Sequence, residues 1–118
     1  MFYYCQALEE VVFPKVSTVN SGVFSYCTNL TKIDLGGAIT RLSSAFMAYA
    51  NKVTALILRG VTTVPTLGTS AFTSSTIKSG TGYVYVPKEL EATFKVASNW
   101  STYAAQIRAI ENYPEICG

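Results

Sequence analysis

The sequence contains no histidine, so it lacks the side chain that most often serves as a general base near neutral pH and as a zinc ligand. Its three cysteines, Cys5, Cys27 and Cys117, are widely spaced and form no Cys-x-x-Cys pair. A structural zinc ion takes four ligands, which this set does not supply. A catalytic thiol also needs a partner base. We therefore expect no metal site, no cofactor and no cysteine-based catalysis.

Charge is scarce as well. Charged residues make up 14% of the chain, and the nine lysines and arginines lie singly along it. No basic stripe is present to neutralise a phosphate backbone. The apolar runs are far shorter than the roughly 20 residues that cross a bilayer, and the start, "MFYYCQALEE", lacks the regions of a signal peptide. We expect no nucleic-acid partner, no membrane span and no signal peptide in this chain.

The acidic and glycine-rich stretches do not indicate an enzyme. Glu9 and Glu10 precede a predicted strand and point to opposite faces, and Glu89 and Glu91 lie in a helical first turn, where the macrodipole favours acids. Neither pair resembles two carboxylates held across a cleft. The glycines in "LGGA" and "KSGTGY" lack the strand–helix context and the lysine of a phosphate loop. We predict a non-enzymatic protein.

What the sequence does contain is a repeat. Phe2, Phe24 and Phe46 recur at a fixed spacing, and Phe72 follows after a longer step. Three further sets of apolar residues recur with them: Leu8, Leu30 and Val53; Val11, Ile33 and Leu56; Phe13, Leu35 and Leu58. The last two sets lie two residues apart, as in a short strand with one buried face. We predict strands at about 11–13, 33–35 and 56–58, and a last one at about 84–86 in "YVYVP".

A unit of this length cannot bury its own apolar residues. Stacked on copies of itself, it lines up equivalent residues inside a common core and pairs its strands side by side. The 118 residues suffice for one such domain. We therefore predict an α/β-type repeat fold, a solenoid with short parallel strands.

The repeated sequence pattern also resembles that of a known family. "FYYCQALEEVVF" and "FSYCTNLTKIDL" share the pattern F-x-x-C-x-x-L-x-x-[VI]-x-[FL], which V/I-T-x-[VL]-x-x-x-[AV]-F follows. This pattern resembles the BspA-like (treponemal-type) leucine-rich repeat of bacterial and some protist surface proteins, over roughly residues 1 to 86. Ala50 departs from it by replacing the expected cysteine. The resemblance implies a leucine-rich-repeat solenoid from a bacterial cell-surface or secreted protein.

The composition changes after Gly82. "PKELEATFKVAS" predicts a helix that begins at Pro87 and packs Leu90, Phe94 and Ala97 inward. A stack of repeats needs such an amphipathic lid at its end. The segment also resembles the C-terminal cap of BspA-like repeat proteins. We divide the chain into repeats at 1–82 and a last strand with a helical cap at 83–118.

Two further elements are predicted inside the cap. "NWSTYAAQI" indicates a second helical turn, capped by Asn99 or Ser101, with Trp100 and Tyr103 packing inward. "IRAIENY" allows one more strand through its two isoleucines, Ile107 and Ile110. The N-terminal end lacks an equivalent lid, so we expect either a fragment of a longer solenoid or self-association through this uncapped end.

Two sets of repeat-equivalent residues invite a structural interpretation. Cys5 and Cys27 occupy the same repeat position, about 5 Å apart if the strands are neighbours. A disulfide is sterically conceivable there, but we favour buried cysteines acting as small hydrophobic residues. Tyr4 and Tyr26 are likewise equivalent, with Tyr49 near them, and we expect half-buried stacking of these rings.

The candidate binding residues lie between the two inward positions of each strand, or directly before or after them. Residues there point away from the core, and we expect them to face solvent. The candidates are Val12, Lys32, Asp34, Ile57, Arg59, Tyr83 and Tyr85. A row of aromatic, aliphatic and charged groups on a regular face is typical of a protein- or glycan-binding surface.

Two functions remain open from the sequence. By resemblance, the chain is an adhesion or binding module that contacts proteins or glycans through the repeat face. The alternative is a structural stalk or terminal cap of a larger protein, with no ligand of its own. A more remote alternative is a module that accompanies an enzymatic domain elsewhere in a parent protein.

Overall fold

The computed structural model describes residues 9–13, 15, 24, 26–42, 46–47, 49–50, 52–68, 80–97 and 99–117. The predicted anchors Phe2, Leu8 and Phe72, together with Cys5, Tyr4 and the N-terminal end, lie outside these residues. The side chain of Cys117 does too.

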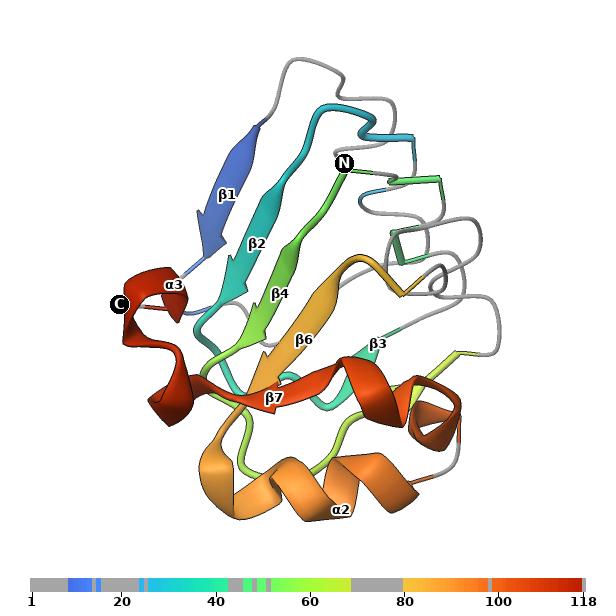
Figure 1. Ribbon diagram of the computed structural model, residues 1–118, viewed down its shortest axis with the longest axis vertical. Coiled ribbons are helices and arrows are strands. Elements are labelled where there is room, and N and C mark those ends of the chain that lie inside the picture. The colour runs from blue at the N-terminus through green and yellow to red at the C-terminus, as the bar shows by residue number, and fades with distance from the viewer. Residues whose placement is uncertain are drawn as a thin grey trace.

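A five-stranded parallel sheet dominates the structure (Figure 1). Its order is β1 (Glu10–Phe13), β2 (Lys32–Leu35), β4 (Ala55–Leu58), β6 (Tyr83–Val86) and β7 (Ile107–Ala109). The register places Val11 opposite Ile33, Ile33 opposite Leu56, and Leu56 opposite Val84. The four strands predicted from the repeat are therefore present and parallel, each beginning one residue earlier than expected.

The threonines that directly precede β2 and β4 hydrogen-bond to the preceding repeat. The Thr31 N–H donates to Glu9 O at 2.7 Å, and the Thr54 N–H donates to Thr31 O at 2.8 Å. The hydroxyls of both threonines donate to the same two carbonyls, at 2.9 and 3.3 Å. The same residue type thus makes the same bond one repeat later, which keeps neighbouring units in register.

The core lies on one face of the sheet and combines the predicted repeat positions with residues of the cap such as Phe94 and Trp100. Its buried members include Leu30, Ile33, Leu35, Val53, Leu56, Leu58, Val84 and Val86. Phe24 and Phe46 meet there edge to face, with ring centroids 5.5 Å apart, and the Phe24 N–H donates to Phe46 O. The predicted stacking of these two anchors is confirmed. Cys27 and Ala50 are both buried, which agrees with a small apolar residue at that position.

Two tyrosines stack in the turns that precede β2 and β4. The rings of Tyr26 and Tyr49 lie 4.7 Å apart and nearly parallel. Both residues have positive φ, 61° and 64°, which is uncommon for a bulky side chain. The shared conformation shows that they occupy equivalent turns. The stacking of this pair is confirmed and Tyr26 is half-buried as expected, whereas Tyr49 is 41% exposed.

A second, two-stranded parallel sheet was not predicted. It pairs β3 (Arg41–Leu42) with β5 (Thr66–Leu67), and its register places Leu42 opposite Leu67. Leu42 in I-T-R-L (39–42) and Val64 in V-T-T-V (61–64) hold equivalent places in the repeat pattern, yet Leu42 pairs with Leu67, three residues further on. Pro65 has no N–H to donate to a ladder, so regular pairing begins after it.

The C-terminal cap contains the predicted helix. Pro87 precedes η1 (Lys88–Leu90), a 3-10 turn that leads directly into α2 (Glu91–Val96). Phe94 is fully buried, and Leu90 and Ala97 pack against the core. In Figure 1, α2 runs along the β7 end of the sheet.

The second helical turn, η2 (Trp100–Gln106), is also present. Trp100 is buried edge to face against Phe94 at 4.9 Å, and Tyr103 is partly buried against the core. The predicted side-chain cap is wrong, because no side chain caps η2. Asn99 has φ 67° and instead uses its Nδ2 to donate to Leu67 O at 2.7 Å.

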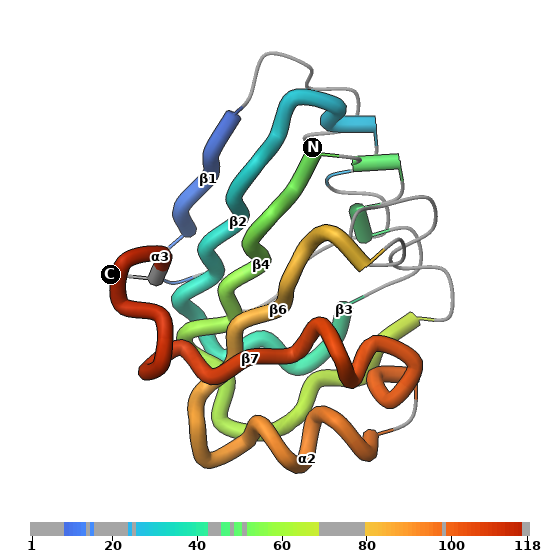
Figure 2. Tube along the Cα trace, viewed as in Figure 1, coloured from blue at the N-terminus to red at the C-terminus, as the bar shows by residue number. Residues whose placement is uncertain are grey.

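The chain leaves the sheet earlier than predicted. β7 ends at Ala109, so Ile110 is not part of the strand. Two short turns follow, η3 (Ile110–Asn112) and α3 (Pro114–Cys117). They carry the chain back toward β1 and β2, as Figures 1 and 2 show, across the face of the sheet opposite the core.

Candidate functional site

The candidate site is the face of the sheet that points away from the core, which we call the outer face. Strand alternation places one or two residues of each strand on it. Its members are Glu10, Val12, Lys32, Asp34, Ala55, Ile57, Tyr83, Tyr85 and Arg108. The repeat register brings these residues into rows, so Val12, Asp34, Ile57, Tyr85 and Arg108 lie on successive strands.

Half of this face is covered by residues 110–117, which we call the C-terminal segment. Ala55, Ile57 and Tyr85 are buried in a small apolar cluster beneath the segment's Ile110, Tyr113 and Ile116. The rings of Tyr85 and Tyr113 meet edge to face at 5.4 Å. The prediction that Ile57 and Tyr85 face solvent is therefore wrong. They point away from the core as expected, but a second apolar layer forms over them.

Two cations hold the C-terminal segment against the sheet. The Arg108 guanidinium lies 3.4 Å from the centre of the Tyr83 ring and 4.7 Å from that of Tyr113, so it makes cation–π contacts with both. The Lys32 ammonium donates to Ile116 O at 2.9 Å. Lys32 and Tyr83 are accordingly only half-exposed.

The other half of the outer face is open. Val12 on β1 is 59% exposed, and Glu10 beside it is also exposed. On the neighbouring strand, Asp34 is only 8% exposed because Arg59 binds its carboxylate with two hydrogen bonds of 2.8 and 3.1 Å. The expectation that Asp34 faces solvent is therefore wrong, whereas Arg59 remains exposed. We call Glu10, Val12 and Arg59 the open margin.

The sequence reasoning missed the residues that cover the face. Arg108 was not a candidate, and Ile110 was placed in a strand. One signal was available: Ile110, Tyr113 and Ile116 recur every third residue directly after the last strand. That spacing indicates an apolar stripe along a helical turn, which must bury itself somewhere.

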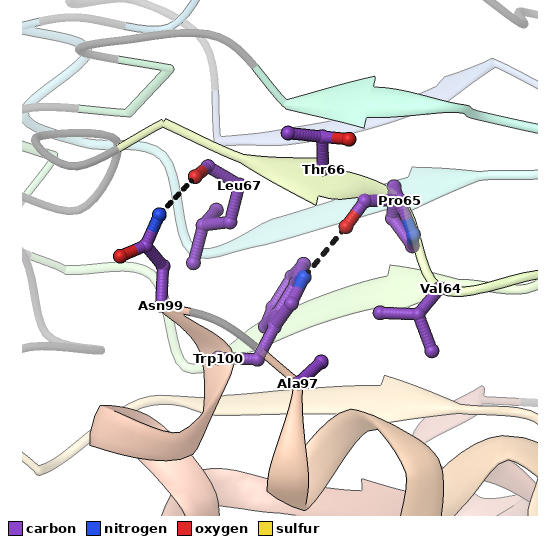
Figure 3. Close-up of a pocket in the computed structure, with 7 residues that line it drawn as sticks. All are labelled: Val64, Pro65, Thr66, Leu67, Ala97, Asn99 and Trp100. Atoms are coloured by element: carbon purple, nitrogen blue, oxygen red, sulfur yellow. Dashed lines mark hydrogen bonds between the residues drawn. The ribbon is translucent and has the colours of Figure 1, made fainter.

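A separate pocket of about 230 Å³ lies between β5 and the cap (Figure 3). Its lining is Val64, Pro65, Thr66, Leu67, Ala97, Asn99 and Trp100. The indole N–H of Trp100 donates to Pro65 O at 2.8 Å, and Asn99 donates to Leu67 O. The side chains of Trp100 and Asn99 therefore join the cap to β5. The pocket marks a structural junction, and none of the described residues that line it is charged.

The described residues show neither a metal site nor a membrane helix. Among them, no three cysteine, aspartate or glutamate side chains gather closely enough to hold a metal ion. Within the same residues, no helix is long and apolar enough to cross a bilayer.

The fold and the repeat register agree with the comparison against known families. Residues 1–97 match the BspA type leucine rich repeat region, in six copies. The chain therefore belongs to the BspA-type leucine-rich-repeat family. Members of this family are generally protein-binding or structural modules rather than enzymes, and they are typically surface or secreted proteins. No curated protein and no solved structure matches the chain.

Proposed function

We propose that the chain is a non-enzymatic binding module of a bacterial cell-surface or secreted protein. It contacts a protein or glycan through the outer face of its sheet and serves adhesion. The BspA-type repeat family supports the class of function. The location on the outer face is supported by one observation above all, the exposure of Val12 on β1 beside the exposed Glu10.

Val12 is one of few large apolar side chains exposed among the described residues. The exposed Glu10 is on the same strand as Val12. Asp34 lies opposite Val12 on β2, and its ion-pair partner Arg59 directly follows β4. An apolar centre with a charged rim is the usual anatomy of a contact surface. Val12 lies on a hydrogen-bonded sheet, which presents a preformed surface to a ligand. The protein therefore loses little conformational freedom when the ligand binds.

The chain offers a matched pair of valines for the test. Val12→Glu places a charge in the open margin, and Val96→Glu places the same charge on α2, where Val96 is 79% exposed. We expect the wild-type chain to capture a ligand from arrays of extracellular proteins and glycans. Val12→Glu abolishes that capture and Val96→Glu retains it. Both variants unfold within about 0.5 kcal/mol of wild type, as surface substitutions do. Equal capture by the two variants contradicts the assignment of the open margin.

A structural role is the second candidate, and the C-terminal segment favours it. By covering Ala55, Ile57 and Tyr85, the segment removes the most apolar part of the face from contact. A stalk or terminal cap needs such a closed surface to stay soluble. Arrays in which the wild-type chain captures nothing support this role and contradict the binding module.

The remaining proposals concern the parent protein. We propose that the parallel ladder is part of a solenoid, with repeats at 1–82 and a last strand with its cap at 83–118. The in-register pairing of β1, β2, β4 and β6 supports this arrangement. Export is tested by treating intact cells with protease: a surface protein is degraded from outside, whereas an internal one survives.

A further inference from the structure

The C-terminal segment contacts the outer face as a short peptide ligand would. Its three inward residues, Ile110, Tyr113 and Ile116, are spaced every third residue and rest on Ala55, Ile57 and Tyr85. Its other side chains from Glu111 to Glu115 are exposed. The segment therefore presents an aliphatic–aromatic–aliphatic stripe to the sheet and a polar side to solvent.

The conformation of the segment depends on the face beneath it. η3 has three residues and α3 has four, far fewer than the 12 or so that an isolated helix needs to be stable in water. Two hydrogen bonds reach the segment from elsewhere, from Lys32 Nζ to Ile116 O and from the Lys88 N–H to a Glu111 carboxylate oxygen at 3.0 Å. A segment of this kind is an element that a competing ligand can displace.

Charge on the two surfaces is complementary. Lys32 and Arg108 lie on the outer face at the edges of the covered area, and both contact the C-terminal segment. The segment itself carries two acids, Glu111 and Glu115, and no base. The covered part of the outer face therefore suits an acidic segment better than a basic one.

We propose that this covered part is a docking site for a short acidic segment of a partner protein, with aliphatic, aromatic and aliphatic residues at three-residue spacing. The C-terminal segment occupies the site as an internal ligand. The inference rests on the proposed binding function. It gives the protein a second binding surface besides the open margin, and the C-terminal segment closes this second surface until a partner displaces it. A tethered ligand has a high effective concentration, so a partner in solution binds only the fraction of molecules in which the site is open.

The test uses the full chain and a labelled synthetic peptide of residues 110–118 with the change Cys117→Ser. The double variant Tyr113→Ala/Ile116→Ala weakens the internal ligand without altering the sheet. If the site is open in a tenth or less of wild-type molecules, the variant binds the peptide about tenfold more tightly or better, measured by fluorescence anisotropy. Asn112→Ser, an uncharged change on the exposed side of the segment, is the control and keeps wild-type affinity. A Tyr113→Ala peptide should bind the variant at least tenfold more weakly.

Amide NMR spectra locate the peptide. We expect shifts at Ala55, Ile57 and Tyr85 in the double variant, and native-like dispersion elsewhere. If the double variant loses that dispersion, Ile116→Ala alone replaces it in the same comparison. Equal peptide affinity for wild type and variant, no saturable binding, or shifts confined to other surfaces overturns the proposal. Those results leave the Val12→Glu capture test intact, because it probes residues that the segment does not cover.

Discussion

Gly60→Ala tests how closely neighbouring repeats approach each other. Gly60 follows β4, and an added Cβ would lie 2.0 Å from the carbonyl oxygen of Gly36 and 2.7 Å from that of Gly37, in the turn after β2. Ordinary carbon contacts lie at about 3.5 Å or more, so the two turns would have to separate by about 1.5 Å. Both atoms are backbone, so no side-chain rotation can relieve the clash.

The separation has a second cost. The Arg59 N–H donates to Leu35 O at 3.0 Å directly beside the clash, and a shift of that size breaks this bond. Overpacking costs about 1–3 kcal/mol and a lost hydrogen bond about 0.5–1.5 kcal/mol. Alanine recovers about 0.4–1 kcal/mol by restricting the unfolded chain. We expect Gly60→Ala to lower the free energy of unfolding by about 0.5–4 kcal/mol.

Urea unfolding followed by the fluorescence of the single tryptophan, the buried Trp100, measures this change. The urea midpoint should fall with an unchanged slope, because the surface exposed on unfolding stays the same. Thr62→Ala, an exposed change two residues further on, is the control and should stay within about 0.5 kcal/mol of wild type. A cost of Gly60→Ala below that value would refute the close stacking of the two turns.

Three further predictions follow from buried groups. Leu30→Ala truncates a fully buried repeat leucine and should cost about 2–5 kcal/mol in urea unfolding, whereas a cost typical of surface sites contradicts its inward position. Trp100→Phe removes the indole N–H from Pro65 O and should cost about 1–3 kcal/mol in urea unfolding followed by circular dichroism, since this variant has no tryptophan; unchanged stability argues against that bond. Burial raises the pKa of the Tyr103 phenol above its ordinary value of 10.0. The unfolded chain therefore ionises first, so the free energy of unfolding should fall as the pH rises above about 10, and Tyr103→Phe should lessen that fall.

The candidate site could be predicted only in part. Strand alternation correctly separated Val12 and Ile57 from the core residues between them, since this period is local to each strand. It could not show that Ile57 is buried and Val12 exposed, because the burial of Ile57 depends on a segment distant in sequence that lies above it. The same holds for Asp34, whose burial depends on an arginine from the next repeat.

The sequence by itself determined the parallel strands and their register. Val11, Ile33 and Leu56 recur at equivalent places, and only stacking in register buries all three together. It also determined the cap helix, since Pro87 and the spacing of Leu90, Phe94 and Ala97 are local signals. The return of the C-terminal segment over Ile57 and Tyr85 was decided by tertiary structure alone. A repeat pattern specifies contacts between like units, whereas this contact joins a unique segment to a surface distant in sequence, and no periodicity records it.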